Sequence, residues 1–269
     1  MINVTVAGAT GRMGGRITAL CVEHPEINLV GAFERKGHER VGEDIGEILG
    51  LGKVNVKLTD DINTYIDKTD VLIDFTSVGA TLQNLRVASE HKKAMVIGTT
   101  GFTDEDMKEI QALASDIPCV LAPNMSVGVN LLFKVLALVA KVLGEDYDVE
   151  IIEAHHRMKK DAPSGTALKM AKIIAEALDR NLDDVAVYAR KGLIGERDRR
   201  EIGIQCIRAG DIVGEHTVMF ATMGERVEIT HKASSRDTFA RGAVRAALWI
   251  YGKEPGLYDM LDVLNLKNL

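Results

Sequence analysis

The sequence predicts an α/β protein: an N-terminal Rossmann-type doubly wound parallel sheet, followed by a second, mixed α/β domain. Three observations indicate this fold class. Short β-branched segments alternate with helical segments through the first half of the 269 residues. A glycine-rich turn joins the first strand to the first helix. In the second half, strands follow one another across short turns, which is typical of a separate sheet with antiparallel pairs.

The elements of the first half follow from their hydrophobic periods. Short apolar segments predict buried strands, and apolar residues on one face of a 3.6-residue period predict helices. The pair His24-Pro25 ends the first helix, because proline cannot continue the helical hydrogen bonds. The predicted strands cover residues 2–7, 28–34, 54–58, 71–75, 94–97 and 118–121. The predicted helices cover residues 12–23, 80–90 and 104–114.

The second half starts with a long, strongly apolar helix. This helix covers residues 127–143, and a polar loop at 155–163 leads into another helix at 166–178. The predicted strands cover residues 148–154, 185–190, 202–208, 213–221 and 226–232, and a last helix covers 238–251. We therefore expect a first domain over residues 1–126, onto which residues 237–269 pack back, and a second domain over residues 127–236.

Composition excludes several classes of protein. The net charge is −6, whereas nucleic-acid binders usually carry a basic surplus, so we expect no nucleic-acid partner. The three cysteines lack close ligand spacing, which indicates reduced thiols rather than disulfides or a metal site. No apolar run reaches the ~18 residues of a membrane span, and the N-terminus lacks a signal-peptide pattern. We expect a cytoplasmic protein without membrane contact.

A dinucleotide site is predicted at Gly8-Ala9-Thr10-Gly11-Arg12-Met13-Gly14, between the first strand and the first helix. Glycines allow a tight turn and close approach to a pyrophosphate, and a helix N-terminus offers unpaired N–H groups. The spacing G-x-x-G-x-x-G differs from the usual G-x-G-x-x-G, and a purely structural turn is the alternative.

The end of the second strand carries an acidic and a basic residue side by side. Glu34 lies where a carboxylate accepts hydrogen bonds from a ribose 2′-hydroxyl. Arg35 follows it, and a guanidinium there can hold a 2′-phosphate instead. The pair predicts tolerance of both NADH and NADPH. The alternative is that Arg35 and Lys36 form an ordinary solvated turn.

Two further loops follow parallel strands, where a doubly wound sheet places its ligand crevice. They are Gly98-Thr99-Thr100-Gly101 and Ala122-Pro123-Asn124-Met125. The first is small and rich in hydroxyls, so it can lie close to a ribose or nicotinamide. Each loop alone is a weak signal, but together with the N-terminal turn they describe one cofactor crevice.

A substrate site is predicted between Glu153 and Thr166, where two histidines and three cationic side chains lie within six residues. The stretch ends in Ser164-Gly165-Thr166 at a helix start, which can receive a carboxylate as it would a phosphate. The expected ligand is a small anion with more than one carboxylate. A solvated basic surface is the alternative, and Ser164 as a nucleophile is disfavoured because G-x-S-x-G is absent.

The His155-His156 pair raises the possibility of a metal site. Adjacent residues on a strand point to opposite faces, and no further His or Cys lies at ligand spacing. We therefore expect no metal.

Blocks spread over nearly the whole chain resemble the 4-hydroxy-tetrahydrodipicolinate reductase family. The most specific is EAHHRMKKDAPSGT at Glu153–Thr166. The others are GATGRMG at Gly8–Gly14, ER at Glu34–Arg35, IDFT at Ile73–Thr76, VIGTTGF at Val96–Phe102, NMSVGVN at Asn124–Asn130, RAGDIVGEHTVMF at Arg208–Phe220 and ERVEITHKASSR at Glu225–Arg236.

The resemblance implies a function. The family reduces a cyclic imine derived from 4-hydroxy-tetrahydrodipicolinate to tetrahydrodipicolinate, with loss of water, in lysine and diaminopimelate biosynthesis, using NADH or NADPH. Its second domain binds the dicarboxylate and forms a homotetramer. The family's acid/base histidine falls on His155, its proton-donating lysine on Lys159, and its carboxylate contacts on His156, Gly165 and Thr166. The family's cofactor contacts fall on residues 8–13, 34–35, 98–100 and 122–125.

Two departures and two rival functions accompany the resemblance. Many members carry another histidine where this chain has Met158, and some carry phenylalanine where it has Met125. The rivals are an aspartate-semialdehyde- or homoserine-type dehydrogenase on the same fold, and a non-catalytic NAD(P)-sensing protein. A sensor would keep the glycine turn but would not need Lys159 or Ser164–Thr166.

Overall fold

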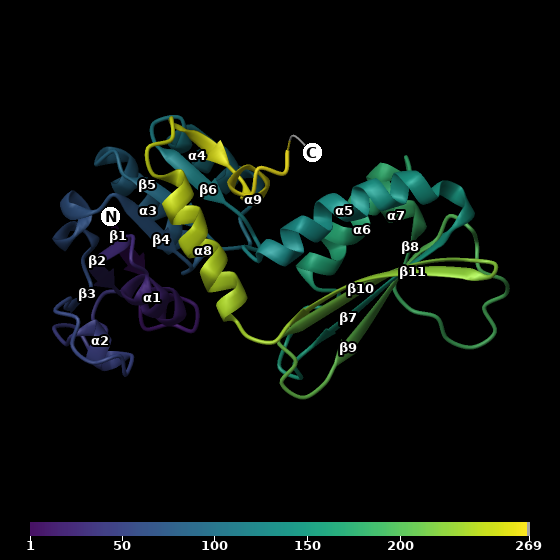
Figure 1. Cartoon of the computed structure of the whole chain (residues 1–269), viewed down its shortest axis with the longest axis horizontal. Coiled ribbons are helices and arrows are strands. Elements are labelled where there is room, and N and C mark those ends of the chain that lie inside the picture. The colour runs from purple at the N-terminus through teal and green to yellow at the C-terminus, as the bar shows by residue number, and fades with distance from the viewer. Residues whose placement is uncertain (268–269) are drawn as a thin grey trace. The chain divides into compact units, whose positions relative to one another are not determined.

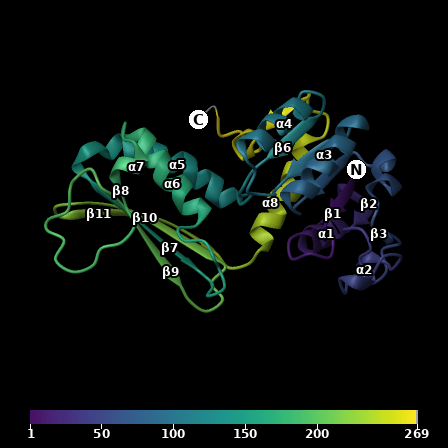
Figure 2. The ribbon, with the colours of Figure 1, turned by 180° about the vertical axis from the view of Figure 1, so that it is seen from behind.

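A computed structural model describes residues 1–267 of the chain, and these residues form two compact units. Unit 1 comprises Met1–Val127 together with the chain from Arg236 onward, and unit 2 comprises Gly128–Ser235. Each unit has its own sheet and its own hydrophobic core. Figures 1 and 2 show the elements of both units from opposite sides.

Unit 1 contains a seven-stranded sheet in which every strand pair is parallel. In spatial order the strands are β12 (Gly256–Tyr258), β6 (Pro118–Leu121), β5 (Ala94–Ile97), β4 (Val71–Asp74), β1 (Ile2–Ala7), β2 (Ile27–Phe33) and β3 (Leu58–Thr59). The chain runs outward from β1 through β2 to β3, then returns and runs the other way through β4, β5 and β6. The change of direction lies between β1 and β4.

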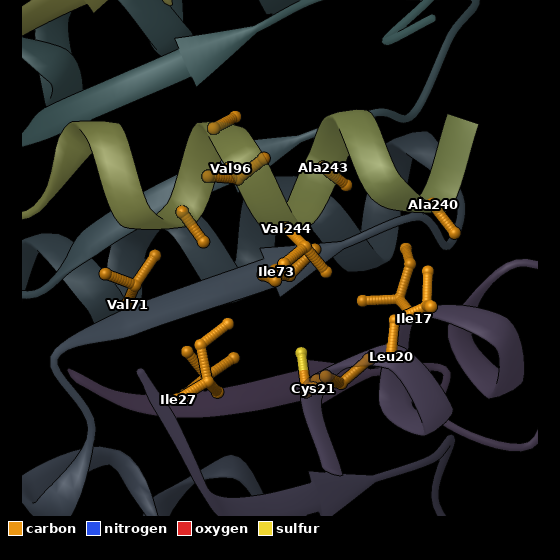
Figure 3. Packing of buried hydrophobic residues seen from close by; sticks show 14 of the residues in the cluster. Ile17, Leu20, Cys21, Ile27, Val71, Ile73, Val96, Ala240, Ala243 and Val244 are labelled. Atoms are coloured by element: carbon orange, nitrogen blue, oxygen red, sulfur yellow. The ribbon is translucent and has the colours of Figure 1, made fainter. Parts of the chain in front are cut away.

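Helices cover both faces of this sheet, so the predicted doubly wound fold is confirmed. Helices α1 (Gly14–Glu23) and α8 (Asp237–Ile250) pack on one face, and α3 (Val78–Glu90) and α4 (Asp104–Ala114) pack on the other. Figure 3 shows Val244 of α8 beside Ile73 of β4, and Ala240 of α8 near Ile17 of α1. The smaller helices of unit 1 are α2 (Ile45–Ile48), η1 (Ile62–Thr64), η2 (Ile66–Lys68) and α9 (Met260–Val263).

Unit 2 contains a five-stranded mixed sheet, as the sequence predicts. Its core residues come from the sheet and from α5 and α6, which lie on one face of the sheet (Figures 1 and 2). In spatial order the strands are β11 (Glu225–Ala233), β10 (Gly214–Thr222), β7 (Asp148–His155), β9 (Ile202–Arg208) and β8 (Ala186–Val187). The helices are α5 (Val127–Leu143), η3 (Gly144–Asp146), α6 (Gly165–Ala177) and α7 (Leu182–Val185).

Two predicted strands are largely wrong. The strand expected at residues 54–58 begins only at Leu58, because the Asp44 carboxylate accepts hydrogen bonds from the backbone N–H groups of Val54 and Asn55 at 3.0 and 2.7 Å. The strand expected at 185–190 is reduced to Ala186–Val187, because Val185 belongs to α7 and only residues 186 and 187 pair with β9. Conversely, the strand β12 was not predicted, and it extends the first sheet beside β6.

The sequence expectation about membrane spans also needs correction. The helical stretch Val127–Asp146 is long and apolar enough to cross a membrane, judged by length and composition alone. A core helix passes the same test. Phe133, Leu136 and Ala140 belong to the core of unit 2, which is the role this helix has in the fold.

Candidate active site

The glycine turn after β1 is tightly packed. Gly8 has a φ of +62°, a left-handed conformation that glycine adopts without strain. A Cβ atom at Gly14 would lie 1.9 Å from the carbonyl oxygen of Gly8, so only glycine allows α1 to start this close to the turn. The backbone of residues 8–14 thus has the close strand-to-helix approach that a dinucleotide pyrophosphate needs.

Glu34, which directly follows β2, faces the glycine turn. Its Oε1 accepts hydrogen bonds from the Thr10 backbone N–H at 3.0 Å and from the Thr10 hydroxyl at 2.7 Å. The same hydroxyl lies 3.3 Å from Nε2 of His38. The two hydrogen bonds from Thr10 hold the Glu34 carboxylate at the carboxyl end of β2, the position where a ribose 2′-hydroxyl is recognised in this fold class.

A cleft of about 610 Å³ opens at the carboxyl ends of β1, β2 and β4 in unit 1. Four predicted cofactor residues line it: Gly8, Gly11, Glu34 and Arg35. The sequence reasoning did not identify the remaining lining residues, which are Phe33, Lys36, Asp60, Asp61, Ile62, Phe75, Thr76, Ser77, Ala80, Gln83, Asn84 and Val87. The signal for Asp60 and Thr76 was available, since each lies just beyond the end of a parallel strand.

Beneath the cleft lies a buried carboxylate that the sequence reasoning also missed. Asp74, the last residue of β4, is completely buried. Its Oδ1 accepts from the Thr76 hydroxyl at 2.7 Å and from the Thr81 hydroxyl at 3.0 Å, and its Oδ2 accepts from the Asn84 amide at 2.7 Å. The Thr81 hydroxyl also lies 2.8 Å from the Thr99 hydroxyl. The network joins the loops after β4 and β5.

The two later loops follow β5 and β6 at the same edge of the sheet, but they are not among the residues lining the cleft. A Cβ atom at Gly98 would lie 2.1 Å from the ring of Phe75, so glycine is required for packing there. Thr99, Ala122 and Met125 are buried, and the last two belong to the core of unit 1. Of the other predicted residues, Ala9 is buried, Met13 and Asn124 are half-buried, and Arg12, Thr100 and Pro123 are exposed.

In unit 2, His155 is the last residue of β7, and it pairs with a glutamate two residues earlier on the same face of the strand. The Nδ1 atom of His155 lies 2.5 Å from Oε2 of Glu153. Glu153 is completely buried, and His155 is 9% exposed. Burial lowers the pKa of His155, and the hydrogen bond to Glu153 offsets only part of this effect.

Arg208 on β9 holds the same glutamate. Its guanidinium donates to both carboxylate oxygens of Glu153, at 2.7 and 2.8 Å. Burial alone would raise the pKa of Glu153, but hydrogen bonds from Arg208, His155 and Cys206 outweigh it and lower this pKa to about 2. Glu153 is therefore an ionised carboxylate at neutral pH.

A second histidine contacts the start of α6. His216 on β10 lies edge-on to His155, with ring centroids 5.2 Å apart, and burial lowers the pKa of His216 to about 4. Its Nε2 is 3.0 Å from the hydroxyl of Ser164, which also accepts from the Ala167 N–H at 3.2 Å as the N-cap of α6. The Ser164 hydroxyl therefore already has two partners.

The polar loop between β7 and α6 carries Lys159. Its ammonium lies 2.9 Å from the Asp161 carboxylate, and this hydrogen bond lowers the pKa of Asp161. The loop is tied to the sheet by a hydrogen bond from Arg208 to the Asp161 carbonyl at 2.6 Å. His156 is half-buried, and Met158 is 73% exposed.

The start of α6 is open toward solvent. Gly165 is exposed, and no atom lies within 4 Å of where its Cβ would be, whereas Thr166 is half-buried. Over residues 1–267, no three His, Cys, Asp or Glu side chains gather as a metal site would require. The arrangement in unit 2 is thus a helix N-terminus and a cationic loop beside a buried Glu-His pair, which suits a small carboxylate ligand.

Comparisons with known proteins agree with this geometry. Residues 2–125 match the family model described as dihydrodipicolinate reductase, N-terminus, and residues 128–264 match dihydrodipicolinate reductase, C-terminus. The 4-hydroxy-tetrahydrodipicolinate reductase of Syntrophus aciditrophicus is 57% identical over 268 residues, covering 100% of both chains. The enzyme of that name from Hahella chejuensis is 59% identical over 267 residues, 99% of this chain and 100% of the relative.

A solved structure shares the fold over nearly its full length. It is the dipicolinate-bound dihydrodipicolinate reductase from Paenisporosarcina sp. TG-14, with a TM-score of 0.77 and 26% identity, covering 97% of this chain and 98% of the other. The resemblance seen in the sequence motifs is confirmed by these matches. The chain belongs to the dihydrodipicolinate reductase family.

Proposed function

We propose that this chain is a 4-hydroxy-tetrahydrodipicolinate reductase, an oxidoreductase that forms tetrahydrodipicolinate with loss of water in lysine and diaminopimelate biosynthesis. The observation that carries the proposal is the identity of 57–59% over the full length with relatives of that name. It extends through both units, so it includes both the nucleotide cleft and the Glu153–Thr166 stretch. A nucleotide sensor would need only the first of these.

NADH or NADPH binds to unit 1 in this proposal. The residues present fit a dinucleotide, because Gly14 lets the helix approach the turn and Glu34 is held at the end of β2. Arg35, at the edge of the cleft, is available for a 2′-phosphate. Gly8–Met13 contact the pyrophosphate, and the loops at Gly98–Thr100 and Ala122–Met125 contribute through their backbones, since Thr99, Ala122 and Met125 are buried. When bound, the reduced nicotinamide supplies the hydride.

The dicarboxylate substrate binds to unit 2. The exposed N-terminus of α6 at Gly165 and Thr166 receives one carboxylate, with His156 beside the same loop. Ser164 fixes the start of the helix through its cap hydrogen bond. Lys159 adds positive charge, because its present partner Asp161 is largely exposed and can be exchanged for the ligand at low cost.

Proton transfer is assigned to Lys159 and His155. As the imine is reduced, negative charge develops on the ring nitrogen and its conjugated atoms. The Lys159 ammonium stabilises this charge and delivers a proton, with His155 assisting. Both groups lie at the carboxyl end of β7 or in the loop that follows it, so one short segment supplies binding and proton transfer.

A homotetramer and a cytoplasmic location complete the proposal. In unit 2, α5 and α6 lie on one face of the sheet. The other face carries apolar residues that are only partly buried: Ile152 and Met219 are half-buried, and Ile207 is 48% exposed. Burying this face between copies of the chain would remove apolar area from water. The cysteines Cys21, Cys119 and Cys206 are free thiols, which suits a reducing compartment. Light scattering on the purified protein tests the tetramer.

A coupled assay tests the function. The product of dihydrodipicolinate synthase is added with NADH or with NADPH, and oxidation of the nucleotide is followed by the decrease in absorbance of its reduced form. We expect turnover with this substrate, none when aspartate semialdehyde replaces it, and none when homoserine is added with NAD⁺ or NADP⁺. Turnover of either of those compounds in its place, or nucleotide binding without turnover of any, would contradict the proposal.

A further inference from the structure

The strongest unexplained feature of unit 2 is the buried glutamate behind His155. Glu153 is completely buried, and four N–H donors converge on its carboxylate. Oε1 accepts from the Arg208 guanidinium at 2.7 Å and from the Ser164 backbone N–H at 3.1 Å. Oε2 accepts from Arg208 at 2.8 Å and lies 2.5 Å from Nδ1 of His155. The mechanism above assigns no role to Glu153 or Arg208.

The hydrogen bonds decide which nitrogen of His155 carries a proton. An ionised carboxylate only accepts hydrogen bonds, so the Nδ1 atom of His155 must donate to Glu153. In the neutral imidazole the Nε2 atom is then unprotonated, and it is the nitrogen that exchanges protons. Space beside Nε2 is kept by Gly214 on β10, where a Cβ atom would lie 3.1 Å from Nε2.

We propose that Glu153 and Arg208 are positioning residues for the reaction: the arginine-held carboxylate fixes His155 in the Nδ1-protonated form and stabilises the imidazolium formed when Nε2 takes up a proton. This inference rests on the proposed function, in which His155 exchanges a proton during reduction. Nε2 first takes up a proton from solvent, which forms the imidazolium. The Nε2–H bond then breaks as this proton passes to the reacting ring or to a Lys159 amine that has given up its own, which returns His155 to the neutral imidazole with no net oxidation of the protein.

Arg208 makes the largest contribution to keeping the buried Glu153 carboxylate ionised. Burial favours the protonated acid, and the bidentate guanidinium opposes it. Arg208 lies directly across from His155 in the pairing of β7 with β9. Its further hydrogen bond to the Asp161 carbonyl at 2.6 Å joins the Glu-His pair to the loop that carries Lys159. The Arg208 guanidinium thus holds both Glu153, which contacts His155, and the loop that carries Lys159.

The other charged and titratable groups around His155 affect its pKa in directions that follow from their charges. The carboxylate of Glu153 raises the pKa of His155, and the charges of Lys159 and Arg208 lower it. His216, whose pKa is about 4, is a neutral neighbour above pH 5. Cys206 keeps its proton because burial raises its pKa to about 11, and it donates to Glu153. Removing the Glu153 charge should therefore lower the pKa of His155.

The test compares Glu153→Gln with Glu150→Gln. Glu150 lies on the same strand and is also held by a bidentate arginine, Arg190, at 2.8 and 2.9 Å, but it does not contact His155. We expect Glu153→Gln to lower kcat by about 10²-fold, the lower end of the effect of general acid–base groups. The pH dependence of kcat should shift toward lower pH, and the KM and nucleotide Kd should stay within about threefold. Glu150→Gln should leave the shape of the pH profile unchanged.

A double variant separates positioning from simple destabilisation. If Glu153 acts through His155, adding Glu153→Gln to His155→Ala should cost little further activity. A purely structural role predicts that the two losses multiply. Equal pH profiles for Glu153→Gln and the wild type, or multiplied losses, would overturn the proposal.

Nuclear magnetic resonance of ¹⁵N-histidine-labelled wild-type protein provides a measurement that depends on neither activity nor a buried variant. The His155 resonances should report a protonated Nδ1 and an unprotonated Nε2 at neutral pH. The opposite tautomer would overturn the inference. Because this arm uses no substrate, it remains decisive even if the coupled assay shows that the proposed reaction is wrong.

Discussion

Within residues 1–267, each unit completely buries one side-chain carboxylate, and the two are held by different kinds of donor. Asp74 in unit 1 is held by neutral donors: the hydroxyls of Thr76 and Thr81 and the amide of Asn84. Glu153 in unit 2 is held by the Arg208 guanidinium and the His155 imidazole. The contacts of Asp74 join the loops after β4 and β5. A carboxylate joined to a histidine also sets where that histidine carries its proton.

The difference separates the tasks of the two units. The Asp74 network lies under the cleft of unit 1, to which we assign the nucleotide, and it links the loops after β4 and β5. The Glu153 network lies behind the groups proposed to move protons. Changes in unit 1 should therefore alter nucleotide affinity, whereas changes in unit 2 should alter kcat and its pH dependence.

The largest effect is expected for Lys159→Ala, which removes the proposed proton donor. We expect kcat to fall by about 10²–10⁴, the usual range for a general acid, with an unchanged Kd for the nucleotide. Steady-state kinetics and fluorescence titration of the nucleotide measure the two quantities. Lys160→Ala, an exposed lysine in the same loop, is the control. A loss below threefold would reject the assignment.

For unit 1, Arg35→Ala should weaken NADPH binding by about 10–100-fold, since a hydrogen bond to a charged group contributes about 1.5–3 kcal/mol. NADH binding should change little because it lacks the 2′-phosphate. Dissociation constants for both nucleotides measure the effect, and Arg40→Ala is the control, because Arg40 is half-buried and paired with Glu43 at 2.7 Å. An unchanged preference between the nucleotides would show that Arg35 has no phosphate role.

Asp74→Asn sharpens the comparison between the two buried carboxylates. The amide presents one acceptor oxygen in place of two, so at least one buried donor loses its partner, at a cost of about 1–3 kcal/mol in the free energy of unfolding. The nucleotide Kd should rise while the pH profile of kcat stays unchanged. The same measurements of unfolding and of nucleotide binding on Asp70→Asn provide the control. Asp70 directly precedes the same strand, at its opposite end. A shifted pH profile in Asp74→Asn would break the division of tasks.

The smallest effect is expected for Thr166→Val at the start of α6. Loss of one hydroxyl contact to a bound carboxylate corresponds to about 0.5–1.5 kcal/mol, or roughly a 2–10-fold rise in KM. Because the carboxylate is bound in both the ground and the transition state, kcat should stay nearly constant. Steady-state kinetics of Thr166→Val measures both kcat and KM. A fall in kcat without a change in KM would show that Thr166 acts in the chemical step instead.

The features predicted well from sequence are those whose chemistry is local. The turn at Gly8–Gly14 needs glycine because neighbouring backbone atoms would collide with a side chain, and the requirement is visible in the spacing. The parallel sheet follows from alternating hydrophobic periods. The strand at 54–58 failed because a side chain, Asp44, rather than a neighbouring strand satisfies the backbone there.

The partners of the buried carboxylates could not be predicted, because they come from distant parts of the chain. Arg208 lies 55 positions from Glu153, and Thr99 lies 25 positions from Asp74. No local period connects such residues; only the pairing of β7 with β9 and of β4 with β5 brings them together. The short β12 was missed for a similar reason, since its three residues form a strand only beside β6.

The most direct test of the account is a crystal structure of this protein with NADH and pyridine-2,6-dicarboxylate, a planar mimic of the substrate. We predict one carboxylate of the mimic at the backbone of Gly165 and Thr166, with the Lys159 ammonium turned from Asp161 toward the ring. A mimic bound away from this loop and from the start of α6 would contradict the proposed substrate site.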